Sequence, residues 1–171
     1  MHHTLFVTML LALLALPGLA GAGETTDFVK LDAAGRELAD QAADWAMVTD
    51  RTTGLTWEVK TDDNSLHDRD NVYSWKDTEA TFIKGLNEEK FGGFADWRLP
   101  EDKELERLQK LNDQEPQLFA RYFPNTAPSL YWTWSRCQDG THNSAKLKFG
   151  PEPSPQARQN RVRAVRGVQK E

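Results

Sequence analysis

One stretch decides the fold of this chain: it reads GGFADWRLP and spans residues 92–100. Its two successive glycines permit a tight chain reversal, because a residue without a Cβ adopts positive φ at little cost. In the extended segment that follows, Trp97 and Leu99 point to one side, and Asp96 and Arg98 point to the other. The proline at the end suits the junction into a helix. We therefore predict a turn, a short strand and a helix start, in which Asp96, Trp97 and Arg98 hold the fold rather than contact a ligand.

Helical patterns lie on both sides of this stretch. Apolar residues recur at helical spacing in two stripes, namely Phe82, Ile83 and Leu86 before the stretch and Leu105, Leu108 and Leu111 after it. Asp77 or Thr78 can cap the first helix, which we expect to end near Lys90. The second helix begins after the proline, and acidic residues crowd its first turn, where the helix dipole favours negative charge.

Strand patterns occupy the two ends of the chain. Apolar or alternating runs cover residues 28–31, 45–48, 55–59, 131–134, 145–149 and 161–165. A turn from Asp50 to Gly54 joins the second and third runs into a hairpin. Prolines 116, 124 and 128 predict an irregular stretch after the second helix. The pattern as a whole predicts an α+β fold with two helices.

The first residues have the layout of a secretory signal peptide. An apolar run from Leu5 to Leu16 precedes a small-x-small cleavage site that ends at Ala22. The run is shorter than the roughly 20 residues that a membrane-spanning helix needs. We therefore expect residues 1–22 to be a signal peptide and residues 23–171 to form one domain, which is periplasmic or secreted and has no stable membrane span.

Cysteine usage limits how such an exported domain is held together. Cys137 is the only cysteine, so an internal disulfide is impossible and packing must stabilise the domain. Six tryptophans supply large apolar units for a core. We expect Cys137 to be a free, buried thiol, with an intermolecular disulfide as the alternative.

Basic residues gather near the carboxy terminus. Residues 140–171 hold seven basic and two acidic residues, a net charge of +5, whereas the whole chain carries −5. If the runs 145–149 and 161–165 pair, four cations share one solvent face with a fifth at its edge, and this predicted anion-binding face consists of Lys146, Lys148, Arg158, Arg161 and Arg163. Sulfate, phosphate or an acidic protein surface would bind there. The alternative is that Arg163 or Arg166 pairs with carboxylates of the acidic body and closes the fold.

Sequence signals for metal and nucleophile chemistry are weak. The acidic loop Asp62 to Asn71 does not match the EF-hand spacing. Two interpretations of this loop stay open, a looser calcium site and a plain solvated loop. The chain has neither a Gly-x-Ser-x-Gly sequence nor a phosphate-binding Gly-x4-Gly-Lys-Ser/Thr sequence. We therefore expect no cofactor, no catalytic residue and no nucleic-acid partner.

Four blocks in register resemble the bacterial Lcl carboxy-terminal-type domain, over about Phe28 to Gly167. The blocks are a first hairpin with Gly54 and Trp57, the central stretch with Gly92, Gly93, Asp96, Trp97, Arg98 and Pro100, a later block from Phe123 to Thr133, and a closing strand from Val162 to Gly167. Relatives often carry Cys at positions 47 and 91, where this chain has Met47 and Phe91, and Thr at the position of Glu101. The missing Thr removes a helix N-cap oxygen worth about 1 kcal/mol.

The resemblance implies a C-type-lectin-like fold, in which two helices pack on small twisted antiparallel sheets. This fold is related to that of formylglycine-generating enzymes. Those enzymes use active-site cysteines, and the single Cys137 argues against that activity. Adhesion to sulfated glycosaminoglycans is the family role that the resemblance suggests. We therefore expect an exported, non-catalytic binding module that recognises a glycan, another polyanion or a protein on the cell envelope. An inhibitor or immunity-type partner of another exported protein is the alternative, and an enzyme is a third.

Overall fold

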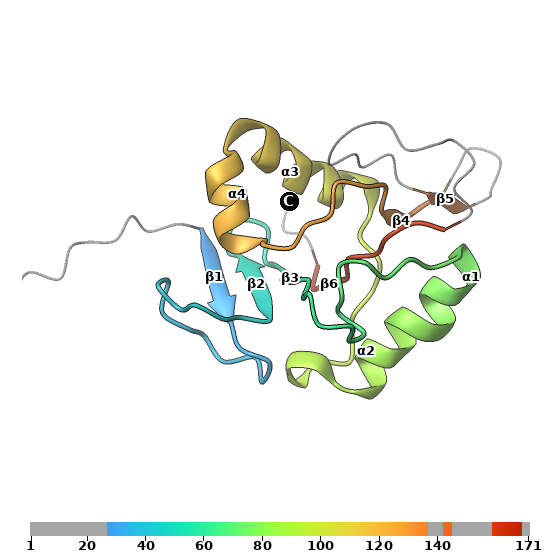
Figure 1. The fold of residues 1–171 in the computed structure, drawn as a ribbon, viewed down its shortest axis with the longest axis horizontal. Helices are drawn as coiled ribbons and strands as arrows, with labels where there is room; N and C mark the ends of the chain where they lie inside the picture. The colour runs from blue at the N-terminus through green and yellow to red at the C-terminus, as the bar shows by residue number, and fades with distance from the viewer. Residues whose placement is uncertain (1–26, 137–141, 145–158, 169–171) are drawn as a thin grey trace, which may run out of the picture.

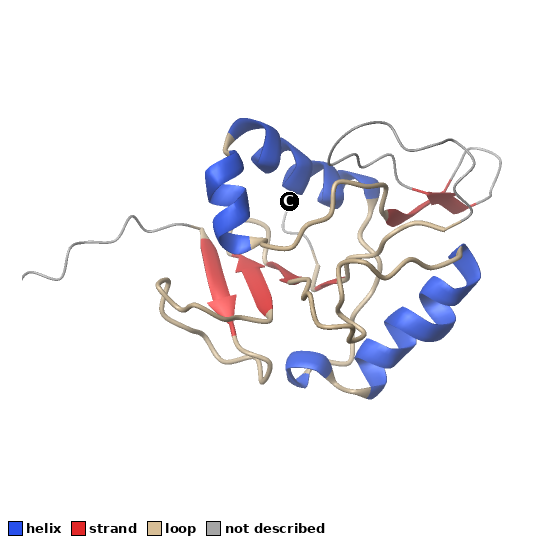
Figure 2. Ribbon diagram, in the orientation of Figure 1, coloured by secondary structure: helices blue, strands red, loops and turns tan. Residues whose placement is uncertain are grey.

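The computed structural model describes residues 27–136, 142–144 and 159–168. Several predictions from the sequence lie outside these residues: the signal peptide 1–22, Cys137, the strand 145–149, and the basic residues Lys146, Lys148 and Arg158. The described residues form an α+β fold (Figure 1; Figure 2). No helix among them is long and apolar enough to cross a membrane.

A four-stranded antiparallel sheet stands at the centre of the fold. Its strands are β1 (Phe28–Leu31), β2 (Met47–Asp50), β3 (Leu55–Glu58) and β6 (Val165–Arg166), in the order β1-β2-β3-β6. The predicted hairpin is confirmed, because β2 and β3 pair across the turn. Asp50 fixes that turn by accepting a 2.9 Å hydrogen bond from the backbone N–H of Thr52. A second sheet pairs β4 (Trp132–Arg136) with β5 (His142–Ser144).

The first helical region is continuous but begins earlier than predicted. It comprises α1 (Trp75–Asp77), a π-helical segment η1 (Thr78–Ile83) and α2 (Lys84–Glu88), and a 3-10 turn η2 (Phe91–Gly93) follows. Ser74 caps it instead of Asp77 or Thr78, since its hydroxyl accepts a hydrogen bond from the backbone N–H of Asp77. The predicted stripe is confirmed, because Phe82, Ile83 and Leu86 are buried.

The second helical region is longer than predicted. It comprises α3 (Asp102–Gln114), as expected from its leucines, and α4 (Pro116–Tyr122), where the sequence predicted an irregular stretch. Pro116 opens α4 at a position where its missing N–H needs no partner, so this proline starts a helix instead of breaking one. Phe119 and Tyr122 of α4 are buried.

Alternation along β2 divides the core between the two faces of the sheet. Val48 belongs to a cluster with Trp57, Leu105 and residues of α4, whereas Met47 belongs to a cluster with Phe82, Leu86, Trp97 and Leu99. The helical regions α3–α4 and α1–α2 therefore cover opposite sides of the strands (Figure 2).

The closing segment, residues 160–167, runs through the middle of this arrangement. Asn160 bridges Tyr73, Arg161 bridges Tyr131, and Val165 bridges Arg98, while β6 pairs with β3. Only Val165–Arg166 is regular strand, so the predicted strand 161–165 is mostly a series of single bridges. Val162 and Ala164 of this segment are buried, at 1% and 0% exposure.

The stretch 92–100 makes the predicted turn and leads into the predicted helix, but the predicted short strand is only a single bridge at Arg98. Gly92 and Gly93 have φ of 66° and 80° and reverse the chain. Trp97 and Leu99 are buried, and the indole N–H of Trp97 donates a 2.9 Å hydrogen bond to the carbonyl of Phe91. The backbone of Gly35 packs against this turn so closely that a Cβ at Gly35 would lie 2.4 Å from the carbonyl oxygen of Gly92.

We predict that Gly35→Ala destabilises the domain more than Gly93→Ala does. Both glycines have positive φ, which costs roughly 1–2 kcal/mol for alanine. A Cβ at Gly93 meets nothing within 4 Å, whereas one at Gly35 meets backbone, which adds about 1–3 kcal/mol of overpacking. Urea unfolding of both variants measures the difference, and equal free energies of unfolding would refute this packing.

Candidate functional site

Arg98 clamps the start of α3 to the end of the closing segment. Its guanidinium donates hydrogen bonds of 2.8 and 2.7 Å to the two carboxylate oxygens of Glu104, and another of 3.0 Å to the carbonyl of Gly167. Glu104 is 3% exposed and also accepts a 2.7 Å bond from the backbone N–H of Glu101. Glu101 and Glu104 thus form a capping box, and the expected loss of the N-cap oxygen is wrong, because the Glu101 side chain accepts from the backbone N–H of Glu104. The hydrogen bonds between Arg98 and the carboxylate of Glu104 raise the pKa of Arg98.

Asp96 holds Arg166, the residue that precedes Gly167 in the closing segment. Its carboxylate accepts hydrogen bonds of 2.7 and 3.1 Å from the guanidinium of Arg166, which lies 3.7 Å from the ring centroid of Phe94. The hydrogen bonds from Arg166 lower the pKa of Asp96. The polar groups of Asp96 and Arg98 therefore contact other parts of the domain. This is what we predicted for residues that hold the fold.

A buried group of charges lies on the other side of the closing segment. The carboxylate of Glu58 is fully buried and lies 3.0 Å from Lys60 Nζ and 3.0 Å from His67 Nδ1. Its other oxygen accepts a 3.0 Å bond from the backbone N–H of Ala164. Burial alone would raise the pKa of Glu58, but the charge of Lys60 and the hydrogen bond from His67 outweigh it and the pKa is lowered. Glu58 therefore anchors the closing segment by accepting a hydrogen bond from its backbone.

The predicted anion-binding face is wrong for Arg163. This residue is 1% exposed, because its guanidinium turns inward to donate bonds of 2.9 Å to the carbonyl of Glu58 and 2.7 Å to the hydroxyl of Thr126. Single bridges, unlike a regular strand, do not keep strict alternation, so Arg163 is buried together with its neighbours. The alternative in which Arg166 pairs with a carboxylate is the arrangement observed, with Asp96 as the partner.

Arg161 is the one member of the predicted face that the described residues leave partly exposed. Its side chain is 20% exposed, pairs with Asp70 at 3.2 Å and donates a hydrogen bond to the carbonyl of Arg69. Lys146, Lys148 and Arg158 lie outside the described residues. The described part of the chain therefore brings no group of exposed cations together at this place.

The acidic loop, residues 61–71, is organised around Asp68. This carboxylate accepts hydrogen bonds of 2.8, 2.6 and 2.7 Å from the backbone N–H groups of Asp63, Asn64 and Asp70. Hydrogen bonds from Thr61 and Ser65 lower the pKa of Asp63 to about 2. In the ranges that the structure describes, no three His, Cys, Asp or Glu side chains are placed to hold a metal. The loose calcium site stays a prediction.

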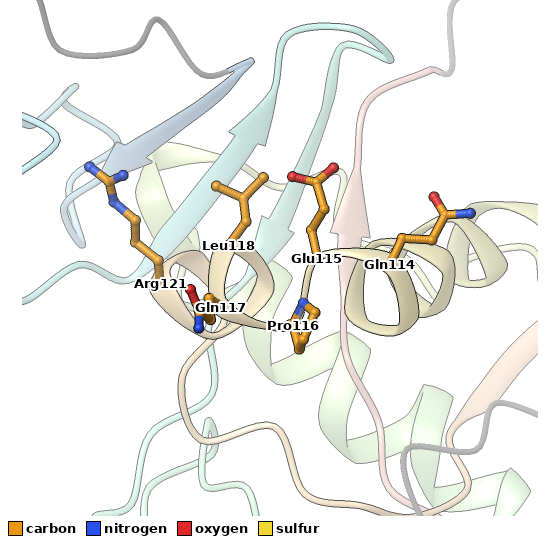
Figure 3. Close-up of a pocket in the computed structure, with 6 residues that line it drawn as sticks. All are labelled: Gln114, Glu115, Pro116, Gln117, Leu118 and Arg121. Atoms are coloured by element: carbon orange, nitrogen blue, oxygen red, sulfur yellow. The ribbon is translucent and has the colours of Figure 1, made fainter.

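A hollow of about 600 Å³ marks the junction of α3 and α4 (Figure 3). Gln114, Glu115, Pro116, Gln117, Leu118 and Arg121 line it. Arg121 already pairs with Asp40, which also accepts a 2.6 Å bond from the hydroxyl of Tyr122. This hollow is open, and the guanidinium of Arg121 in its lining is already paired with the carboxylate of Asp40.

A half-buried tryptophan, Trp75, and an exposed one, Trp134, form an aromatic surface, which sequence reasoning missed. Trp134 of β4 is 40% exposed, and its ring stacks on Trp75 of α1 with centroids 5.9 Å apart. Trp132 packs edge-on against Trp75, with ring centroids 5.4 Å apart, and is buried. A register shift between Trp132 and Ser135 breaks the alternation of β4, so the pattern Trp-Thr-Trp could not show which indole is exposed.

The aromatic surface borders a hollow of about 240 Å³. Leu99 and Trp134 give it apolar walls, and Glu79, Arg98 and Glu101 surround them. Exposed tryptophan beside an apolar hollow is typical of binding surfaces, because the indole supplies a large, rigid contact area. This aromatic surface, made of Trp75 and Trp134 with its hollow, is the candidate site.

We predict that Glu58→Gln destabilises the domain by roughly 3–5 kcal/mol at pH 7, since it leaves Lys60 buried without its counter-charge. The lowered pKa of Glu58 means that its contribution is fully present above the unfolded pKa, about 4.3, and is lost as the pH falls through the lower folded value. Urea unfolding at pH 7 and pH 3 should show the difference between wild type and variant shrinking in acid. The control is Glu88→Gln, an exposed glutamate, and a pH-independent difference would refute the assignment.

Comparison with known proteins places this arrangement in a family. No curated protein and no solved structure matches the chain. The family model of the Lcl C-terminal domain matches residues 46–166, which is more than half of the chain. The match runs from just before β2 to the end of β6, so it includes Glu58, the stretch 92–100 and the closing segment. The chain therefore belongs to the Lcl C-terminal domain family.

Proposed function

We propose that this protein is an exported, non-catalytic binding module and that it holds a glycan or protein of the cell envelope on the aromatic surface. The observation that carries the proposal is the 40% exposure of Trp134, stacked on Trp75 beside an apolar hollow. Tryptophan is enriched among residues that dominate binding energy, and exposed apolar patches mark interaction sites.

The placement of the titratable groups supports a non-catalytic role. The buried charges Glu58, Lys60 and Arg163 are bonded to one another or to backbone, and their pKa values are shifted by burial and by each other's charges. They do not line either of the hollows described above, at the α3–α4 junction and beside Trp134. An enzyme needs such groups to converge on a concave site, whereas here they join the closing segment to the sheet.

The test is capture of envelope components by wild type and by Trp134→Ala, with a glycan array in parallel. We expect wild type to retain a ligand and Trp134→Ala to lose most of that retention, because truncating a central tryptophan typically costs about 2 kcal/mol or more. Val168→Ala is the control, since Val168 is apolar and 86% exposed but does not line the hollow beside Trp134. Retention that is unchanged in Trp134→Ala would reject the aromatic surface.

Two results would redirect the proposal. If the captured ligand is one exported enzyme whose activity falls on binding, the module is an inhibitor, which is the alternative that the sequence left open. If wild type binds heparin at low salt and Trp134→Ala binds it equally, the contact lies on the basic carboxy-terminal residues instead, and binding should weaken with salt.

Export is the second part of the proposal. We predict a mature protein that begins near Gly23 and is found in the periplasm or outside the cell, because the apolar run and the cleavage site have signal-peptide spacing. Amino-terminal sequencing of protein from the cell envelope checks this. An intact Met1 or retention in the cytoplasm would contradict it.

A further inference from the structure

The hollow beside Trp134 has the size of a site for one side chain. At about 240 Å³ it is smaller than the roughly 300–1,000 Å³ of sites that enclose whole small molecules. The described residues that line it come from three parts of the chain: Glu79 from η1, Trp134 from β4, and Leu99 and Glu101 from the segment that leads into α3. A group that projects from a larger partner would enter it, with the rest of the partner lying over the aromatic surface.

Among the described residues that line this hollow, the charge is negative in effect, although Arg98 is one of its walls. The guanidinium of Arg98 already donates two hydrogen bonds to Glu104 and others to the carbonyls of Leu99 and Gly167. Glu79 and Glu101 are exposed. Among the described residues, the carboxylate of Glu79 has no ion pair or hydrogen bond. Two carboxylates therefore lie at the rim, of which that of Glu101 also accepts the backbone N–H of Glu104, while the charge of Arg98 is offset by Glu104.

We infer that this hollow binds the guanidinium or ammonium group of an arginine or lysine side chain on a basic protein partner. The inference rests on the proposed function and specifies the chemistry of its ligand. A cation is attracted to the face of an indole and to carboxylates at its edge, and both are present here. A sulfated glycan would meet the repulsion of Glu79 and Glu101, so charge complementarity favours the basic protein segment.

The experiment follows the indole N–H resonances of 15N-labelled protein during titration with the peptide acetyl-Gly-Arg-Gly-Arg-Gly-amide. The same peptide with citrulline in place of arginine keeps the shape and removes the charge. We expect the arginine peptide to shift the Trp134 resonance and the citrulline peptide to bind several-fold more weakly. Glu79→Gln combined with Glu101→Gln should weaken the arginine peptide roughly fivefold, since each exposed ion pair contributes about 0.5 kcal/mol.

Matched controls separate this site from general attraction to an acidic protein. Glu88→Gln and Glu106→Gln remove exposed carboxylates from α2 and α3 away from the hollow. An equal loss of affinity in these controls, or equal binding of the citrulline peptide, would overturn the inference. If an envelope ligand still depends on Trp134 in the capture experiment while the arginine peptide does not bind, only the inference fails. If neither depends on Trp134, the proposed function fails with it.

Discussion

The bidentate ion pair between Arg98 and Glu104 is the contact on which the rest of the structure depends. It joins three parts of the chain at one point, because Glu104 also satisfies the first turn of α3 and Arg98 also bonds to Gly167 at the end of the closing segment. A strand of two residues, β6, contributes few backbone bonds of its own. With a single cysteine in the chain, no internal disulfide can do this work. Side-chain hydrogen bonds hold the carboxy-terminal segment in place instead.

Glu58 supplies the matching anchor on the other side. Together with the Arg98 clamp it fixes both ends of the run 163–167, through the backbone N–H of Ala164 and the carbonyl of Gly167. Buried charges such as Glu58 and Lys60 stabilise little in net terms, since desolvation offsets their attraction. Breaking such a pair is costly, however, so these residues define one position for the segment. The signature residues Asp96 and Arg98 thus serve the fold, and the exposed aromatic surface is the place where we propose that a ligand binds.

Much of the fold could be predicted from the sequence, because local patterns determine it. The hairpin around Gly54, the turn at Gly92 and the stripes of both helices follow from turn chemistry and apolar spacing. The site could not be predicted in the same way. Alternation along β3 would place Glu58 in solvent, yet the closing segment covers it. Arg163 was expected on an exposed face for the same reason, and the exposure of Trp134 depends on an irregularity in β4 that no pattern shows.

Hydrogen exchange of backbone amides tests most directly whether the closing segment is part of the central structure. The N–H groups of Ala164 and Val165 donate to Glu58 and to the carbonyl of Arg98. If these contacts hold the fold, both amides exchange only through global unfolding, as slowly as the amide of Val48 in the central strand β2. Exchange at Ala164 and Val165 that is orders of magnitude faster than at Val48 would show that the segment opens independently, and would contradict the account.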